Sequence, residues 1–218
     1  MTKVLVVCAH QDDEVYTVGG TIAKFIAEGN NEVWVMFMTD SCSSQYDNYE
    51  EISKVKNEES IKVMNLFGHN TTFNKLPDMK LSLLSAPEIN KPIEKAVQEY
   101  EPTIVLTHHY GDINSDHRAT FEAVRIATRP SVAPFIKMLA CFRGMPGSKD
   151  FTPNLYVDID KYSNVKQEAI ETYETEIRVF PNPRSVTNIQ AIDEMNGAES
   201  NLLTAEAFEI IYQKGLVV

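Results

Sequence analysis

The feature that most constrains the fold is a set of short, continuous apolar runs, each of which passes directly into a polar loop. Residues 4–9 (VLVVCA), 33–38 (VWVMFM) and 104–107 (IVLT) are runs of this kind. A strand that is apolar at every position has both faces buried, which is typical of a parallel sheet covered by helices on both sides. The sequence therefore predicts a sheet in the middle of an α/β domain.

Helical patterns separate these runs, so strand and helix alternate along the chain. Residues 17–28, 49–67 and 118–128 are predicted helices, and Gly68 follows the second of them as a typical stop signal. Repeated β-α-β units give parallel strands with helices on both faces. We therefore predict a single domain over residues 1–218, with a mainly parallel sheet between two layers of helices.

The remaining segments are predicted in the same way. A weak strand is expected over residues 72–76, and the apolar positions between Ile89 and Tyr100 indicate a further helix. In the last third of the chain the patterns predict strands at 138–142 and 155–159, a helix at 161–174 and a short final helix at 205–212.

Two charged residues lie on the otherwise apolar face of the predicted 49–67 helix. Lys56 and Glu59 are three positions apart and share this face with apolar side chains. Buried charges need a partner. The pair either forms an internal salt bridge or belongs to a functional site.

Two polar clusters follow the first and fourth predicted strands. They are residues 9–14 (AHQDDE) and residues 111–117 (GDINSDH). In the common doubly wound order these two strands are neighbours, and ligands bind in the crevice at their carboxyl ends. The two clusters are therefore expected to converge on one site.

The residue types in these clusters are suited to a metal centre. His10 and Asp13 are three apart on a turn that enters a helix, and His117 offers a third ligand. Three protein ligands and a water molecule form a catalytic zinc site, and Asp12 would lie beside that water as its base. The alternative is that these carboxylates are solvated residues that cap helices.

The composition excludes other classes of function. The chain has 31 acidic and 20 basic residues and a formal charge of −11, so we expect neither nucleic-acid binding nor docking to anionic membranes. The apolar run at 4–9 is too short for a signal peptide or a membrane span. Three widely spaced cysteines favour a reducing compartment, and we expect a cytoplasmic protein.

Taken in order along the chain, these segments resemble one known family. Residues 9–14 (AHQDDE) are similar to the Ala-His-Pro-Asp-Asp-Glu signature of the PIG-L/LmbE family of zinc-dependent de-N-acetylases. The pair Asp116–His117 resembles the end of that family's second motif, and residues 183–185 (PRS) and 205–208 (AEAF) are similar to its C-terminal segments.

This resemblance implies a Rossmann-like, single-domain three-layer sandwich and an amide hydrolase acting on an N-acetylated amino sugar or sugar conjugate. It implies Zn²⁺, with Fe²⁺ as an alternative, bound by three side chains, and a carboxylate as general base. Carried over to this sequence, the ligands are His10, Asp13 and His117, and the base is Asp12.

The sequence departs from the family pattern at several positions. Asn114 stands where many members have histidine, and it can donate a hydrogen bond to an oxyanion but cannot deliver a proton at neutral pH. Lys56 replaces the family's arginine, which loses bidentate geometry. We expect Asp116 to orient a ligand or donor, and Lys56, His109 and Arg184 to contact the substrate.

The leading hypothesis is a metal-dependent N-deacetylase with a small-molecule sugar substrate. The alternatives are a hydrolase of another N-acyl or amide substrate and a Rossmann-like binding protein without turnover. A homo-oligomer is compatible with each of these hypotheses.

Overall fold

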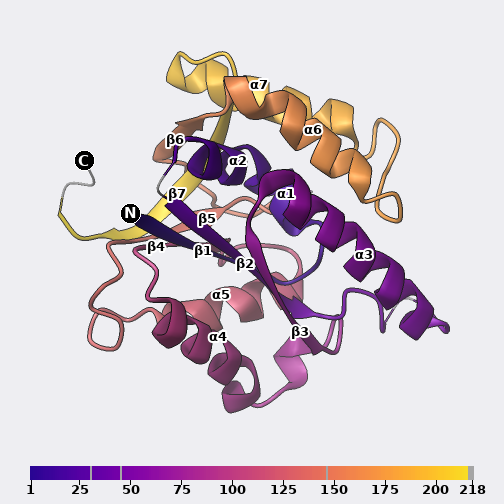
Figure 1. Cartoon of the computed structure of the whole chain (residues 1–218), viewed down its shortest axis with the longest axis vertical. Helices are drawn as coiled ribbons and strands as arrows, with labels where there is room; N and C mark the ends of the chain where they lie inside the picture. The colour runs from indigo at the N-terminus through magenta and orange to yellow at the C-terminus, as the bar shows by residue number, and fades with distance from the viewer. Residues whose placement is uncertain (30, 45, 146, 216–218) are drawn as a thin grey trace.

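A computed structural model of the chain describes residues 1–29, 31–44, 46–145 and 147–215 (Figure 1). Its centre is a seven-stranded sheet with the order β3-β2-β1-β4-β5-β7-β6. The first five strands along this order are parallel to one another, and β7 is antiparallel to both β5 and β6. The strands are β1 (Thr2–Cys8), β2 (Asn31–Thr39), β3 (Asn70–Leu76), β4 (Ile104–His108), β5 (Met138–Phe142), β6 (Leu155–Asp158) and β7 (Ala205–Gln213).

Helices cover both faces of this sheet. Figure 1 shows α2, α6 and α7 on one side of the strands, and α4 and α5 on the other. The helices are α1 (Asp13–Thr17), α2 (Gly19–Ala27), α3 (Tyr49–Phe67), α4 (Ala86–Tyr100), α5 (Ser115–Ala127), α6 (Ser163–Thr172) and α7 (Val186–Ser200), with short 3₁₀ turns η1 (Leu81–Leu83) and η2 (Asp160–Tyr162). The predicted single-domain α/β sandwich with a mainly parallel sheet is confirmed.

The position of β1 in the sheet explains why its residues 4–8 are all apolar. Val4 and Val6 pack into the core beneath α2, α3 and α6, whereas Leu5 and Val7 pack into a second core beneath α4 and α5. Successive side chains of a strand point to opposite faces. A strand between two helical layers therefore has no solvent-facing position.

The prediction of a final helix at residues 205–212 is wrong. This segment forms β7, which inserts between β5 and β6 and pairs with both. Its first residues, Ala205 to Glu209, suit a helix equally well, but pairing on both sides satisfies the backbone of an extended chain. The β-branched and aromatic residues at 210–212 favour the extended form as well.

The sequence analysis missed α7 altogether. Its buried positions are Ile189, Asp193 and Gly197, which lie four residues apart on one face. Because this stripe contains a charge and a glycine, it has no apolar periodicity to reveal a helix. Gly197 is required by a close approach, since a Cβ atom there would lie 2.6 Å from the carbonyl oxygen of Leu203.

The helix expected at residues 17–28 is two helices in the structure. Helix α1 begins earlier, at Asp13, and α2 follows it after a break at Val18. None of the helices in the described part of the chain is long and apolar enough to cross a membrane.

A buried lysine connects the C-terminal elements to α2. The Nζ atom of Lys166 on α6 lies 2.7 Å from Asp193 Oδ2 on α7 and 2.8 Å from Glu206 Oε1 on β7. The Glu206 carboxylate also accepts hydrogen bonds from the backbone N–H groups of Gly20 and Thr21 at the start of α2. This cluster fixes four elements relative to one another.

We expect Lys166→Met to lower the free energy of unfolding by about 3–5 kcal/mol at pH 8, because it leaves two buried carboxylates without their cation. Burial already raises the pKa of Asp193 to about 6, although Lys166 opposes the shift. Without Lys166 that pKa rises further, so in acid the folded variant binds a proton that the unfolded chain does not. The loss should therefore be smaller at pH 5.

Urea unfolding at the two pH values measures this difference. The matched control is Lys95→Met, since Lys95 is exposed and lies 3.7 Å from the exposed Glu99. It should change stability by less than about 1 kcal/mol. Equal stability of the two variants at pH 8 would show that the buried cluster contributes nothing.

Candidate active site

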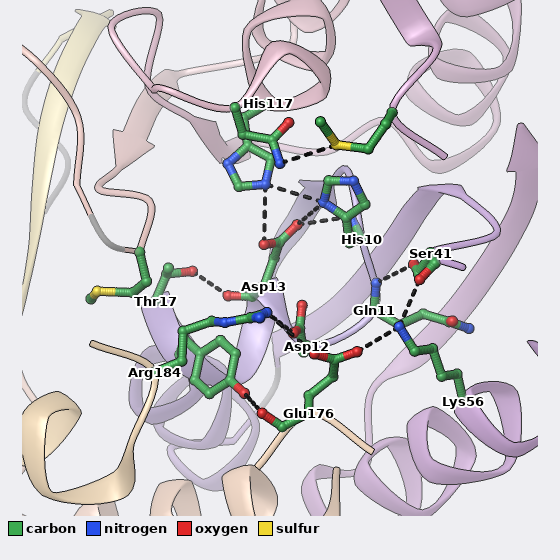
Figure 2. Close-up of a pocket in the computed structure, with 14 residues that line it drawn as sticks. His10, Gln11, Asp12, Asp13, Thr17, Ser41, Lys56, His117, Glu176 and Arg184 are labelled. Atoms are coloured by element: carbon green, nitrogen blue, oxygen red, sulfur yellow. Dashed lines mark hydrogen bonds and ion pairs between the residues drawn. The ribbon is translucent and has the colours of Figure 1, made fainter. Parts of the chain in front are cut away.

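The site lies where β1 and β4 end side by side. Their register pairs Val7 with Thr107, so the loops that follow both strands leave the same edge of the sheet. A cavity of about 250 Å³ opens there. Figure 2 shows its side chains. They come from these two loops and the helices α1 and α5 that follow them, from the segments after β2, β3 and β5, from α3, and from the connection between α6 and α7.

Three side chains bring donor atoms together at the centre of this cavity. His10 Nδ1 lies 3.2 Å from His117 Nε2. The two oxygens of Asp13 complete the group, with Oδ2 at 3.5 Å from His10 Nδ1 and Oδ1 at 3.3 Å from His117 Nε2 (Figure 2). These are the three residues that the sequence analysis selected as ligands.

Each imidazole is held from behind by carboxylates. His10 Nε2 lies 3.2 Å from Asp78 Oδ1 and 3.5 Å from Asp116 Oδ2, and His117 Nδ1 lies 3.0 Å from Asp112 Oδ2. A carboxylate behind a histidine fixes its tautomer and turns the other nitrogen toward a metal. The sequence analysis assigned no role to Asp112, although it lies in the second cluster, and it had no signal for Asp78.

The charges around the two histidines suit a cation. Burial would lower the pKa of His117, but Asp13 and Asp112 outweigh it and raise the pKa to about 9. Burial likewise opposes the pKa shift of His10, which is raised well above its usual value by its carboxylate neighbours. Nitrogen and carboxylate donors in this ratio are those of catalytic zinc sites. The residues present therefore fit a divalent metal ion.

Asp12 lies beside this group and points into the cavity (Figure 2). Its φ of 108° is unusual for a residue with a side chain. Burial raises the pKa of Asp12 to about 7, with contributions from Asp13 and Glu176, while Arg184 and Lys56 act in the opposite direction. A carboxyl with a pKa near neutrality can both accept and return a proton.

Glu176 joins two cations at the floor of the cavity. Its Oε1 lies 2.6 Å from Lys56 Nζ, and its Oε2 lies 3.3 Å from Arg184 Nη1. Arg184 Nη1 also donates to Asp12 Oδ2 at 3.0 Å, and Lys56 Nζ donates to the carbonyl of Ser41 at 2.6 Å. Sequence reasoning missed Glu176 because it follows α6 in a segment without a motif.

The proposed internal pair of Lys56 and Glu59 does not form. Lys56 turns to Glu176, whereas Glu59 accepts hydrogen bonds from the backbone N–H and the hydroxyl of Thr175. Both side chains thus fasten α3 to the connection that follows α6. The partners of Lys56 and Glu59 are far away in the sequence, and no local sequence pattern predicts such contacts.

Asn114 and Asp116 lie at the start of α5 and accept hydrogen bonds from backbone N–H groups. Asn114 is the N-cap, and its Oδ1 accepts the backbone N–H of Asp116 at 2.8 Å. The Asp116 carboxylate accepts the backbone N–H groups of Met79 and Leu81 at 2.7 and 3.1 Å. Asn114 lines the cavity, and its Nδ2 group is 3.8 Å from Met79 Sδ.

His109 is the one predicted substrate contact that does not line this cavity in the described part of the chain. Its Nε2 lies 3.3 Å from Glu209 Oε2 on β7, and its Nδ1 accepts the N–H of Gly111. Lys56 and Arg184 do line the cavity. The structure therefore places His109 in the support of the loop after β4.

Comparison with known proteins identifies the family. The sequence model of the PIG-L family, described as GlcNAc-PI de-N-acetylase, matches residues 5–128. The chain belongs to the PIG-L family. The matched range includes both polar clusters and all three candidate metal ligands, so the resemblance seen in the sequence is confirmed.

Individual PIG-L relatives are distant in sequence and similar in structure. "Probable N-acetyl-alpha-D-glucosaminyl L-malate deacetylase 2" of Bacillus anthracis is 25% identical over 179 residues, 78% of this chain and 79% of the relative. The N,N'-diacetylchitobiose deacetylase from Pyrococcus horikoshii superposes with a TM-score of 0.79 at 21% identity, covering 96% of this chain and 84% of that one.

A hydratase shares the same fold. GalB, the 4-carboxy-2-hydroxymuconate hydratase from Pseudomonas putida KT2440, superposes with a TM-score of 0.82 at 16% identity, covering 100% of this chain and 99% of GalB. One architecture thus carries different reactions, and the argument for function must rest on the family and on the site.

Within this PIG-L site, a glycine makes room for the carboxylate behind His117. A Cβ atom on Gly144 would lie only 1.8 Å from Asp112 Oδ2. The same segment supports the loop through Ser148, whose hydroxyl is 3.4 Å from Asp112 Oδ2 and accepts the N–H of Gly144. Gly144 is therefore needed for the position of Asp112, and through it for the orientation of His117.

We expect Gly144→Ala to weaken the binding of divalent zinc by about 10- to 100-fold, because it displaces the carboxylate that orients His117. Asp112→Asn should have a similar effect without adding volume. Competition with a chromogenic zinc chelator measures the affinity. Gly29→Ala is the control, since nothing lies within 4 Å of its Cβ position and any strain from its φ of 76° stays outside the site. Parent-like zinc affinity in both site variants would remove Asp112 from this role.

Proposed function

We propose that the chain is a metal-dependent hydrolase that removes the acetyl group from an N-acetylated amino sugar or its conjugate. Membership of the PIG-L family and the deacetylase names of its relatives support this proposal. The observation that carries it is the convergence of His10, Asp13 and His117 beside the Asp12 carboxylate in one cavity. The cavity is large enough for an acetamido group and part of a sugar ring.

His10, Asp13 and His117 would hold the ion, with zinc as the first choice and ferrous iron as the alternative. When bound, such an ion polarises the acyl carbonyl and makes a water molecule more acidic. The remaining chemistry belongs to side chains of this protein.

Asp12 is the proposed general base. Its Oδ2 is held by Arg184, and no residue in the described part of the chain donates a hydrogen bond to its Oδ1. Oδ1 would accept a proton as the water oxygen bonds to the acyl carbon. The same proton then passes from Asp12 to the nitrogen as the C–N bond breaks, so that amide and water become amine and acetic acid, which loses its proton to give acetate.

Asn114 is the proposed second donor to the oxyanion. Asn114 lines the cavity, and because its Oδ1 is fixed by the backbone N–H of Asp116, its Nδ2 group is the one left to act as a neutral donor. The present contact of Nδ2 is the weak acceptor Met79 Sδ at 3.8 Å. Asn114 cannot supply a proton, which is why Asp12 serves as acid and base in turn. Lys56 and Arg184 would contact the substrate from the opposite wall.

The direct test is acetate release from N-acetylglucosamine and its simple glycosides by the zinc-loaded protein. We expect turnover that a chelator abolishes and added zinc restores. A panel of other amides separates sugar deacetylation from a broader amidase. Binding of the sugars without any release of acetate would favour a non-catalytic binding protein instead.

In this assay Asp12→Asn should retain zinc but lose about 10²–10⁴-fold in kcat, because an amide cannot accept the proton of water. Asp150→Asn is the matched control, since Asp150 is exposed and also has a positive φ, 58°. Zinc content is measured on both variants. Near-parent turnover by Asp12→Asn would assign the base to another group.

Asn114→Ser separates the oxyanion role of this residue from its capping role. Serine is as good an N-cap as asparagine, so the stability of α5 should be kept. Its side chain is too short to replace the amide donor, and losing one such donor typically lowers kcat by about 10²–10³-fold. If the rate and the thermal midpoint both equal those of the parent, Asn114 acts only as a cap.

A further inference from the structure

One histidine that does not line the cavity touches the segments of all three proposed ligands. His108, the last residue of β4, is fully buried. Its Nε2 atom lies 3.2 Å from Asp13 Oδ2 and 2.9 Å from the backbone nitrogen of Ala9, which directly precedes His10. Its ring stacks on that of His117, with 3.8 Å between the ring centroids and 17° between the planes. A single side chain therefore contacts both halves of the ligand set.

The Nε2 atom of His108 faces a donor and an acceptor at once. The N–H of Ala9 can donate to Nε2 only when this nitrogen carries no proton, whereas the Asp13 carboxylate can accept from Nε2 only when it does. The other ring nitrogen, Nδ1, is buried and has no hydrogen-bond partner among the described residues. A neutral ring therefore satisfies only one of its two neighbours at Nε2.

The charge of Asp13 decides between the two neutral forms of the ring. With the proton on Nδ1, that N–H has no acceptor and the lone pair of Nε2 faces a carboxylate oxygen. With the proton on Nε2, the N–H of Ala9 loses its acceptor and faces another N–H. Each form has one unsatisfied donor and one unfavourable contact, but the bond gained is neutral in the first form and charge-assisted in the second. A charge-assisted hydrogen bond is about twice as strong as a neutral one.

We propose that His108 carries its proton on Nε2 and is a positioning residue for the metal site, since it donates to Asp13 Oδ2 and supports the ring of His117. The backbone N–H of His10 also donates to Oδ2, at 2.8 Å. With Oδ2 held by two donors, Oδ1 is the oxygen left to face the proposed ion, and it lies 3.3 Å from His117 Nε2. The inference rests on the proposed function for the presence of that ion.

Nuclear magnetic resonance tests the position of the proton. Two-bond proton–nitrogen correlation spectra of the labelled, zinc-loaded protein distinguish the two neutral forms of a histidine, and the signals that disappear in His108→Gln belong to His108. We expect the form with the proton on Nε2. A proton on Nδ1 overturns the proposal.

Zinc affinity, measured by competition with a chromogenic chelator, tests the positioning role. His108→Phe keeps a ring that can stack on His117 but removes the donor to Asp13, and we expect zinc binding to be about 10- to 100-fold weaker. His108→Gln should recover most of this loss, because its amide can again donate to the carboxylate. The control His69→Phe removes another buried histidine, which does not line the cavity, and should bind zinc as the parent does.

The thermal midpoints of the ion-free variants separate positioning from packing. If His108 only fills space at the end of β4, phenylalanine serves equally well, and parent-like zinc affinity in His108→Phe overturns the positioning role. Weaker zinc binding at an unchanged midpoint supports it. Should His108→Phe fail to fold, the position of the proton in the parent protein decides.

Failure of this inference differs from failure of the proposed function. Absence of acetate release from N-acetylated sugars by the zinc-loaded parent overturns the proposed function, while the proton position and the zinc affinities still test the role of His108. Conversely, a proton on Nδ1 or an unchanged zinc affinity in His108→Phe overturns that role even when the parent releases acetate.

Discussion

Two histidine nitrogens face each other at 3.2 Å, and this arrangement depends on the carboxylates behind both rings. His10 belongs to the loop after β1 and His117 to the helix after β4, so the pair exists only because these strands are neighbours in the sheet. The carboxylates come from other segments again. Asp78 precedes η1, and Asp112 is held in place by the chain around Gly144. The parallel sheet thus brings the charges to one edge, and the loops determine their orientation.

On the other side of the cavity a carboxylate is held by cations, whereas on the first side histidines are held by carboxylates. Glu176 lies between Lys56 and Arg184, and Arg184 in turn holds one oxygen of Asp12. A carboxylate between two cations can remain charged while buried, since its charge is balanced. The arrangement leaves the second oxygen of Asp12 facing the cavity, where proton transfer is proposed to occur. The C-terminal segment therefore contributes to the site as directly as the two motif loops do.

The sequence revealed what depends on local pattern and missed what depends on distant contacts. Apolar runs and glycine stops predicted β1, β2, β4 and α3, and the two polar clusters predicted which loops converge. The stripe of α7 contains Asp193 and Gly197, because the helix buries a salt bridge and a crossing backbone rather than an apolar face. Residues 205–212 became a strand through pairing with β5 and β6. Glu176 and Asp78 act through contacts that no local pattern records.

The acidic residues that suit this site to a cation also oppose folding when no cation is bound. Burial raises the pKa of Asp12 to about 7 and that of Glu14 to about 8. Any charge that these two carboxyls carry near neutral pH therefore costs free energy, because the charged form has lost its contact with water. An ion that bound only the folded chain would stabilise it, by about 4 kcal/mol when its concentration is 1,000 times Kd. Replacing Asp12 or Glu14 with a neutral residue would favour the ion-free fold, whereas the proposed ion is held by His10, Asp13 and His117. For a protein that binds such an ion, the stability that counts is that of the ion-bound form, because binding and folding are coupled.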